Sequence, residues 1–143
     1  MSQKSTAEIY TRLADKYHSN TEIQAAWDKI FDRFDFAGKR AFLDIGCGPG
    51  GTISLLSQHL KDEKIKFFGV DICDAILEKA RTEVASAIAG NGHTVEFKSG
   101  DALKFLDHCH EKFDVVIASM LLAYVKPEEL FPRIPRFLKN NGT

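Results

Sequence analysis

Apolar residues recur at helical spacing within the first forty positions. After Thr21 they fall at intervals of three and four residues, which predicts an amphipathic helix. Its stripe consists of Ile23, Ala26, Trp27, Ile30, Phe31 and Phe34. A shorter pattern through Ile9, Leu13 and Tyr17 predicts an earlier helix. Residues 1–38 are therefore expected to form an N-terminal helical cap.

From position 39 onward, short apolar runs alternate with helical patterns. The runs have the length of buried strands and are expected at 41–45, 65–70, 94–98 and 113–118. Helical patterns separate them at 52–60, 74–88 and 103–110. Strands that alternate with helices indicate βαβ units and a parallel sheet, so the fold class is α/β. Pro132 and Pro135 are expected to kink or break the helix that begins near Pro127.

Polar residues and glycines gather where the predicted strands end. Asp44 and a glycine-rich loop close the first strand, and Asp71 closes the second. Asp101 follows the third strand and Ser119 follows the fourth. Ligands of open parallel sheets bind outside the carboxyl ends of the strands. The sequence therefore predicts a ligand site at this edge, where glycine lets the backbone approach the ligand closely.

The loop also satisfies a dinucleotide-binding pattern. Gly46, Gly48 and Gly51 fit G-x-G-x-x-G, which would favour an NAD(P)-dependent oxidoreductase. Asp44 and Asp101 argue against this alternative, because carboxylates repel an anionic diphosphate. A ligand with ribose, adenine and a cationic aminoalkyl part suits three acidic groups better.

Composition narrows the class of protein. The chain has 143 residues, 19 basic and 20 acidic, with a net charge of −1 and 44% hydrophobic residues. Near-neutral charge argues against a broad electrostatic grip on nucleic acid or anionic membrane. No apolar run reaches the roughly 20 residues of a membrane helix, and no signal peptide opens the chain.

The cysteines indicate a reduced setting. Cys47, Cys73 and Cys109 show no metal-binding spacing, and an odd number cannot pair completely. We therefore expect a cytoplasmic protein. The run His108-Cys109-His110 lies among charged residues and is read as a solvated face, so no metal site is predicted.

Four segments in order resemble a known family. They are "FLDIGCGPGG", "FFGVDICDAILEKAR", "VEFKSGDALKF" and "FDVVIASMLLAYV". Their order and spacing are similar to those of the class I S-adenosylmethionine-dependent methyltransferases. The resemblance covers about Arg40 to Val125 and implies a Rossmann-like sheet with strand order 3-2-1-4, helices on both faces, and S-adenosylmethionine as cofactor.

The resemblance also implies roles for single residues. Asp44 and the loop residues Gly46, Cys47, Gly48 and Gly50 would contact the methionine part of the cofactor. Asp71 would hold the ribose hydroxyls, and Ile72 and Cys73 would flank the adenine. Asp101 and the N–H of Ala102 would recognise the adenine edge. The pocket near the sulfonium would be lined by Ser119 and Met120, with Tyr17 above it.

The sequence says less about the methyl acceptor and about the partners of the chain. The continuation "MLLAYV" resembles that of members acting on small molecules, and no residue identifies itself as a general base. The family's sheet has seven strands, so residues 39–143 are expected to be a cofactor-binding core that stops before the fifth strand. A homodimer or second subunit would then complete the sheet. A non-catalytic cofactor-binding or interaction module is the further alternative.

Overall fold

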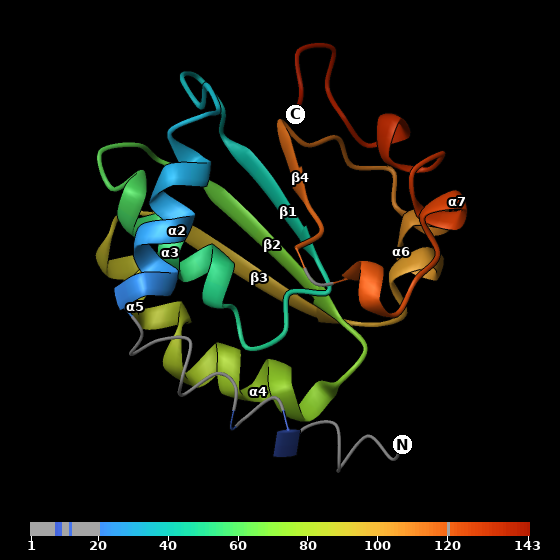
Figure 1. Ribbon diagram of the computed structural model, residues 1–143, viewed down its shortest axis with the longest axis horizontal. Helices are drawn as coiled ribbons and strands as arrows, with labels where there is room; N and C mark the ends of the chain where they lie inside the picture. The colour runs from blue at the N-terminus through green and yellow to red at the C-terminus, as the bar shows by residue number, and fades with distance from the viewer. Residues whose placement is uncertain (1–7, 10–11, 13–20, 120) are drawn as a thin grey trace.

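The computed structural model describes residues 8–9, 12, 21–119 and 121–143. Four parallel strands form a sheet with the order β3-β2-β1-β4, as predicted (Figure 1). The strands are β1 (Ala41–Ile45), β2 (Lys66–Asp71), β3 (Thr94–Ser99) and β4 (Val115–Ile117). The fold is the expected Rossmann-like α/β arrangement.

Helices lie on both faces of this sheet. They are α2 (Thr21–Phe31), α3 (Gly51–His59), α4 (Asp74–Glu83), α5 (Ala85–Gly90), α6 (Ala102–His108) and α7 (Pro127–Leu130), with 3-10 turns at Leu121–Ala123 and Ile134–Arg136. Figure 1 shows α2 to α5 on one side, and α6 and α7 on the other. Within the described ranges, no helix has the length and apolar character needed to cross a membrane.

Alternating residues of the strands supply two separate cores. Phe42 of β1 faces the α2–α5 side and packs with Phe67 of β2, whereas Leu43 faces the α6–α7 side with Leu106. Successive side chains of a strand point to opposite faces, which explains the alternation. Both faces of the central strands are therefore buried, as is typical of a parallel sheet.

The structure differs from the expected elements at two places. The predicted helix 74–88 is divided into α4 and α5 at Val84, whose N–H still bonds to the carbonyl of Ala80 at 3.0 Å. The fourth strand, Val115–Ile117, is shorter than 113–118, and Phe113 pairs with Leu138 of the C-terminal segment. The expected break after Pro127 is confirmed, since α7 has only four residues.

The C-terminal segment lies along the outer edge of β4 (Figure 1). Phe113 forms a parallel bridge with Leu138, and Thr143 donates to the carbonyl of Asp114 and accepts from the N–H of Val116. The two hydrogen bonds of Thr143 have donor–acceptor distances of 2.8 and 2.7 Å. The early part of the β4 edge is therefore paired, which the sequence reasoning did not anticipate.

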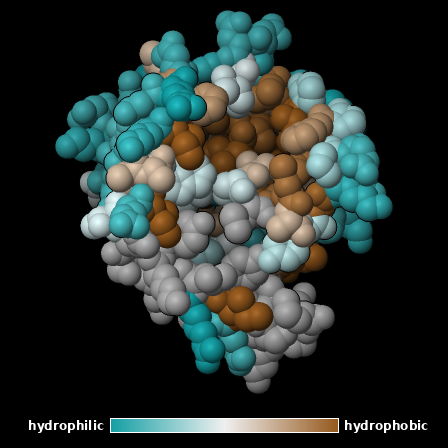
Figure 2. Space-filling view, in the orientation of Figure 1, coloured by the Kyte–Doolittle hydropathy of each residue, from teal (hydrophilic) through white to brown (hydrophobic). Residues whose placement is uncertain are grey.

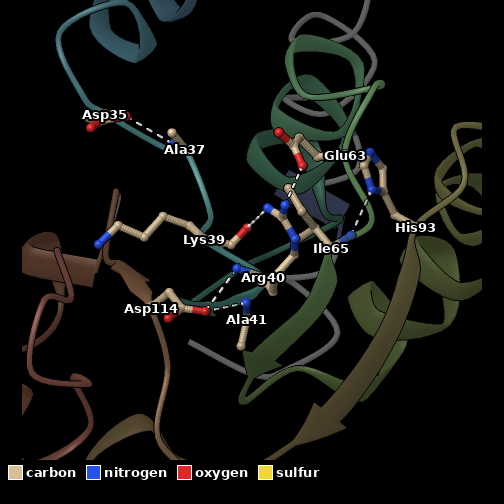
Figure 3. Close-up of polar contacts among 9 residues, drawn as sticks. All are labelled: Asp35, Ala37, Lys39, Arg40, Ala41, Glu63, Ile65, His93 and Asp114. Atoms are coloured by element: carbon tan, nitrogen blue, oxygen red, sulfur yellow. Dashed lines mark hydrogen bonds and ion pairs between the residues drawn. The ribbon is translucent and has the colours of Figure 1, made fainter.

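Polar contacts tie together the amino ends of the strands (Figure 3). Asp114 Oδ2 accepts from the N–H groups of Arg40 and Ala41, each at 2.8 Å, and Lys139 Nζ lies 3.0 Å from the same oxygen. The Arg40 guanidinium pairs with Glu63 at 2.7 Å. Lys39 Nζ donates to the carbonyl of Asn141. This end of the sheet thus joins the entry to β1 with the C-terminal segment.

Candidate cofactor site

A glycine loop forms the centre of the candidate site, between β1 and α3. Its backbone has left-handed φ angles at Gly46 (73°), Gly48 (53°) and Gly50 (84°), which residues with a Cβ rarely adopt. The N–H groups of Gly46 and Cys47 both donate to the carbonyl of Val70, at 2.7 and 3.0 Å. The loop is therefore anchored on the end of β2.

The two sides of this loop differ in crowding. A Cβ at Gly46 would lie 3.1 Å from Leu121 Cδ1, whereas a Cβ at Gly48 would meet nothing within 4 Å. Leu121 follows β4 and is buried. The loop therefore has a packed flank toward Leu121 and, at Gly48, open space where a ligand can approach the backbone.

Asp71 links this loop to the turn after β2. Its Oδ2 accepts from the N–H of Gly48 and its Oδ1 accepts from the N–H of Cys73, both at 2.9 Å. A carboxylate offers about four acceptor positions, so two remain for a ligand. The next residue, Ile72, is 58% exposed and presents an apolar surface beside them.

Asp44 is the most unusual group of the site. Its side chain is buried in β1, and among the described residues neither carboxylate oxygen has a hydrogen-bond partner. Burial, together with the nearby charge of Asp71, raises the pKa of Asp44 to about 8. A buried carboxyl without a partner is costly, and a cation bound beside it would remove that cost.

The end of β3 approaches the end of β2 through backbone contact. The N–H of Gly100 donates to the carbonyl of Asp71 at 2.9 Å. Asp101 then caps α6, because its Oδ1 accepts from the N–H of Lys104 at 2.9 Å. The first-turn N–H of Ala102 has no intrahelical acceptor. One oxygen of Asp101 thus has a structural role, and its other oxygen is the one to consider for a ligand.

The remaining predicted residues divide into three groups. Ser119 is exposed just beyond β4. The thiol of Cys47 is buried in the core, and burial together with the charges of Asp44 and Asp71 raises its pKa well above its usual range. Only the backbone of Cys47 is thus suited to ligand contact. Met120 and Tyr17 lie outside the described residues.

Sequence reasoning missed the residues that support the loop. Leu121 crowds Gly46, and the side chains of Val84 and Phe97 lie 3.3–3.4 Å from the position of a Cβ on Gly50. One signal was available: Gly69 interrupts the apolar run of β2. A glycine inside a strand often marks a close approach of neighbouring groups.

Comparison with protein families identifies the architecture. Residues 42–142 match the family described as "Methyltransferase domain". The chain belongs to this methyltransferase family. The match begins in β1 and includes the glycine loop, Asp71, Asp101 and Ser119.

Two curated relatives agree with this assignment. The carboxy-S-adenosyl-L-methionine synthase of Desulfotalea psychrophila is 31% identical over 102 residues, which cover 69% of this chain and 40% of that protein. The malonyl-[acyl-carrier protein] O-methyltransferase of Halalkalibacterium halodurans is 33% identical over 107 residues, covering 72% and 36%. The chain thus spans less than half the length of these relatives.

A solved structure shows the same fold. The S-adenosylmethionine-dependent methyltransferase of Archaeoglobus fulgidus aligns with a TM-score of 0.65 and 23% identity. The alignment covers 91% of this chain and 53% of that protein. Nearly all of this chain therefore corresponds to about half of that protein.

Proposed function

We propose that this chain binds S-adenosylmethionine at the carboxyl ends of its strands and supplies the cofactor half of a methyltransferase. The observation that carries the proposal is Asp44, a buried carboxyl without a partner among the described residues, beneath a glycine loop. S-adenosylmethionine brings a cationic ammonium and a sulfonium to such a loop. The carboxyl would lose its proton and pair with the ammonium.

The other predicted residues fit separate parts of this cofactor. The backbone at Gly46, Gly48 and Gly50 would follow the methionine part, since Gly48 has open space beside it. The two free acceptor positions of Asp71 suit the ribose hydroxyls, and the exposed side chain of Ile72 suits the adenine face.

The proposal extends to the adenine edge and the sulfonium. The free oxygen of Asp101 would accept from the adenine amino group, and the N–H of Ala102 would donate to the ring. Ser119 is expected near the sulfonium. Met120 is also expected near the sulfonium, with Tyr17 above it. Both residues lie outside the part of the chain that the structure describes.

The bound cofactor would supply an activated methyl group for in-line displacement. This chain's residues would then hold it in position and exclude water, the main requirements of a displacement on an activated carrier. Within the described ranges no side chain is assigned as a general base. An acceptor that must lose a proton would need one from another part of the protein.

Calorimetry with S-adenosylmethionine, S-adenosylhomocysteine and NAD⁺ tests the cofactor. We expect binding of the first two and none of NAD⁺, whose diphosphate carries negative charge toward Asp71. Binding of NAD⁺ alone would overturn the proposal and favour the oxidoreductase alternative. Cofactor binding without turnover on any acceptor would favour a non-catalytic module.

For the acceptor, we propose a small molecule. The relative from Halalkalibacterium halodurans is named for a malonyl group on a carrier protein, which supports a small acyl acceptor. Another relative is a tRNA adenine methyltransferase, so an acceptor panel must include tRNA. The net charge of −1 favours the small-molecule arm, because tRNA binding depends on a basic surface.

We further propose that a second copy or subunit completes the sheet on the β4 side, beyond the C-terminal segment that pairs with Phe113, Asp114 and Val116. Figure 2 shows a hydrophobic hollow over β4, between α2 and the C-terminal segment. Val116 and Ile117 of β4 are only partly buried. Native mass spectrometry tests this proposal: we expect a dimer or larger particle, and Ile117→Lys should shift the distribution toward the monomer.

We also propose a division of the chain into two parts and a cellular location. We propose that residues 1–38 form a helical cap over a core of residues 39–143, which α2 supports by packing Phe31 into the core. A cytoplasmic location is proposed from the three cysteines, all of which are free thiols.

A further inference from the structure

Gly69 lies in the middle of β2, in register with Asp44 on β1 and Phe97 on β3. A Cβ at Gly69 would lie 2.7 Å from Cys47 Sγ and 2.7 Å from Phe97 Cδ1. Neither distance leaves room for a carbon atom. The thiol and the ring therefore meet over the backbone of Gly69, on the face that α3 and α4 cover.

The ring of Phe97 extends from this slot to the glycine loop. Its Cζ lies 3.4 Å from the position of a Cβ on Gly50, the residue that caps α3. Val84 Cγ1 approaches the same position at 3.3 Å. A single aromatic ring thus connects the centre of β2 with the point where the loop becomes a helix.

The backbone of Phe97 is also held by α4. Arg81 Nη2 donates to the carbonyl of Phe97 at 2.9 Å, and Arg81 also pairs with Glu78 within its own helix. Phe97 is 9% exposed and belongs to the core of the α2–α5 face. Its position is therefore fixed by both its backbone and its packing.

We propose that Phe97 is a positioning residue, which holds the glycine loop in its ligand-binding conformation and which the missing side chain of Gly69 accommodates. This inference rests on the proposed function, because it concerns the loop assigned to the cofactor. Phe97 itself is not proposed to touch the cofactor. Replacing its ring with a smaller side chain should loosen the loop, although every residue proposed to contact the cofactor is unchanged.

The test compares Phe97→Leu with a matched control, Phe67→Leu. Phe67 is fully buried in the same core, but it packs against Phe42 and His93, away from the loop. Both variants lose an aromatic ring from one core and should lose comparable stability. Only Phe97→Leu should alter the loop.

Two measurements separate loop positioning from general stability. Four loop amides, those of Gly46, Cys47, Gly48 and Gly50, make hydrogen bonds whose exchange can be followed in the free protein. Phe97→Leu should speed their exchange more than Phe67→Leu does, and should weaken S-adenosylhomocysteine binding about tenfold. Phe67→Leu should leave the affinity unchanged at temperatures where both variants are folded.

A second substitution reaches the same contact from β2. Gly69→Ala should also speed exchange of the loop amides, and its effect should not add to that of Phe97→Leu, because both disturb one contact. Equal loop exchange in Phe97→Leu and Phe67→Leu would overturn the inference. Failure of the wild type to bind S-adenosylhomocysteine would overturn the proposed function instead, and the exchange comparison would still decide the role of Phe97.

Discussion

Two aspartates on neighbouring strands have opposite surroundings. Asp114, just before β4, accepts from the backbone N–H groups of Arg40 and Ala41 (Figure 3) and also from Lys139 Nζ. Asp44, at the far end of β1, is buried with no partner among the described residues. The first carboxylate is satisfied by the protein itself, and the second is left for something else. The comparison separates a residue that supports the fold from one that we propose to bind a ligand.

The pKa values of these two carboxyl groups also shift in opposite directions. Partial burial works against the charge on Asp114, but the hydrogen bonds from Arg40, Lys139 and Ala41 outweigh it and lower its pKa. For Asp44, burial and the charge of Asp71 both raise the pKa, to about 8. Ionisation of Asp114, at the amino ends of the strands, therefore stabilises the fold. Ionisation of Asp44, at the carboxyl ends, destabilises it.

Replacing Asp44 should have the largest effect. The folded protein keeps a proton on Asp44 up to about pH 8, while the unfolded chain releases it near 3.8. The wild-type free energy of unfolding should therefore fall by about 1.4 kcal/mol per pH unit between these values. Asp44→Asn should remove this pH-dependent fall, so the variant should be more stable than the wild type at pH 8. Urea unfolding across pH 5–8 would measure the difference.

The same variant should lose cofactor affinity. A charged hydrogen bond contributes about 1.5–3 kcal/mol, so calorimetry with S-adenosylhomocysteine should show a loss of roughly 10- to 150-fold. A variant that is stabilised and yet binds normally would remove Asp44 from the site.

Replacing Asp114 should show the opposite pattern. Asp114→Ala leaves the N–H groups of Arg40 and Ala41 without their acceptor, so we expect a loss of about 2–3 kcal/mol in stability. S-adenosylhomocysteine affinity should not change. Because the folded-state pKa of Asp114 is lowered, its contribution is present above the unfolded value and is lost as the pH falls below it. The stability difference from the wild type should therefore shrink in acid.

Asp71 is intermediate between these two aspartates, since it has both structural bonds and free acceptor positions. Asp71→Asn keeps the shape and one acceptor oxygen but removes the charge. We expect S-adenosylhomocysteine binding to weaken by about 1.5 kcal/mol or more, with a smaller loss of stability. A loss of stability with unchanged affinity would assign Asp71 to the fold alone.

Sequence patterns predicted the parallel sheet and the position of the glycine loop after β1. Strand β1 was located at its observed bounds, because a short apolar run ending in glycines has few alternative structures. The same reasoning misjudged β4, where pairing between Phe113 and Leu138 depends on residues far apart in the chain. Local patterns carry no information on such contacts.

The support beneath the glycine loop was also beyond local patterns. The sequence showed Gly69 inside a strand, but not that Cys47 and Phe97 fill the space above it. The sequence placed Asp101 after the third strand, and the structure shows that it is also the cap of α6. Both features depend on side-chain directions that follow from the assembled sheet.

The smallest effect concerns the open side of the glycine loop. Gly48 has a φ of 53° and free space around a Cβ, so Gly48→Ala should cost only about 1 kcal/mol of stability, from the left-handed backbone. If the cofactor follows this backbone, the new methyl group occupies its place, and S-adenosylhomocysteine affinity should fall by more than stability does. Gly92→Ala is the matched control, because Gly92 also has a left-handed φ, 83°, and free space but lies in the turn before β3, away from the site. Equal losses of stability with an affinity change only at Gly48 would assign the open side of the loop to the ligand, and unchanged affinity in both variants would place the ligand elsewhere.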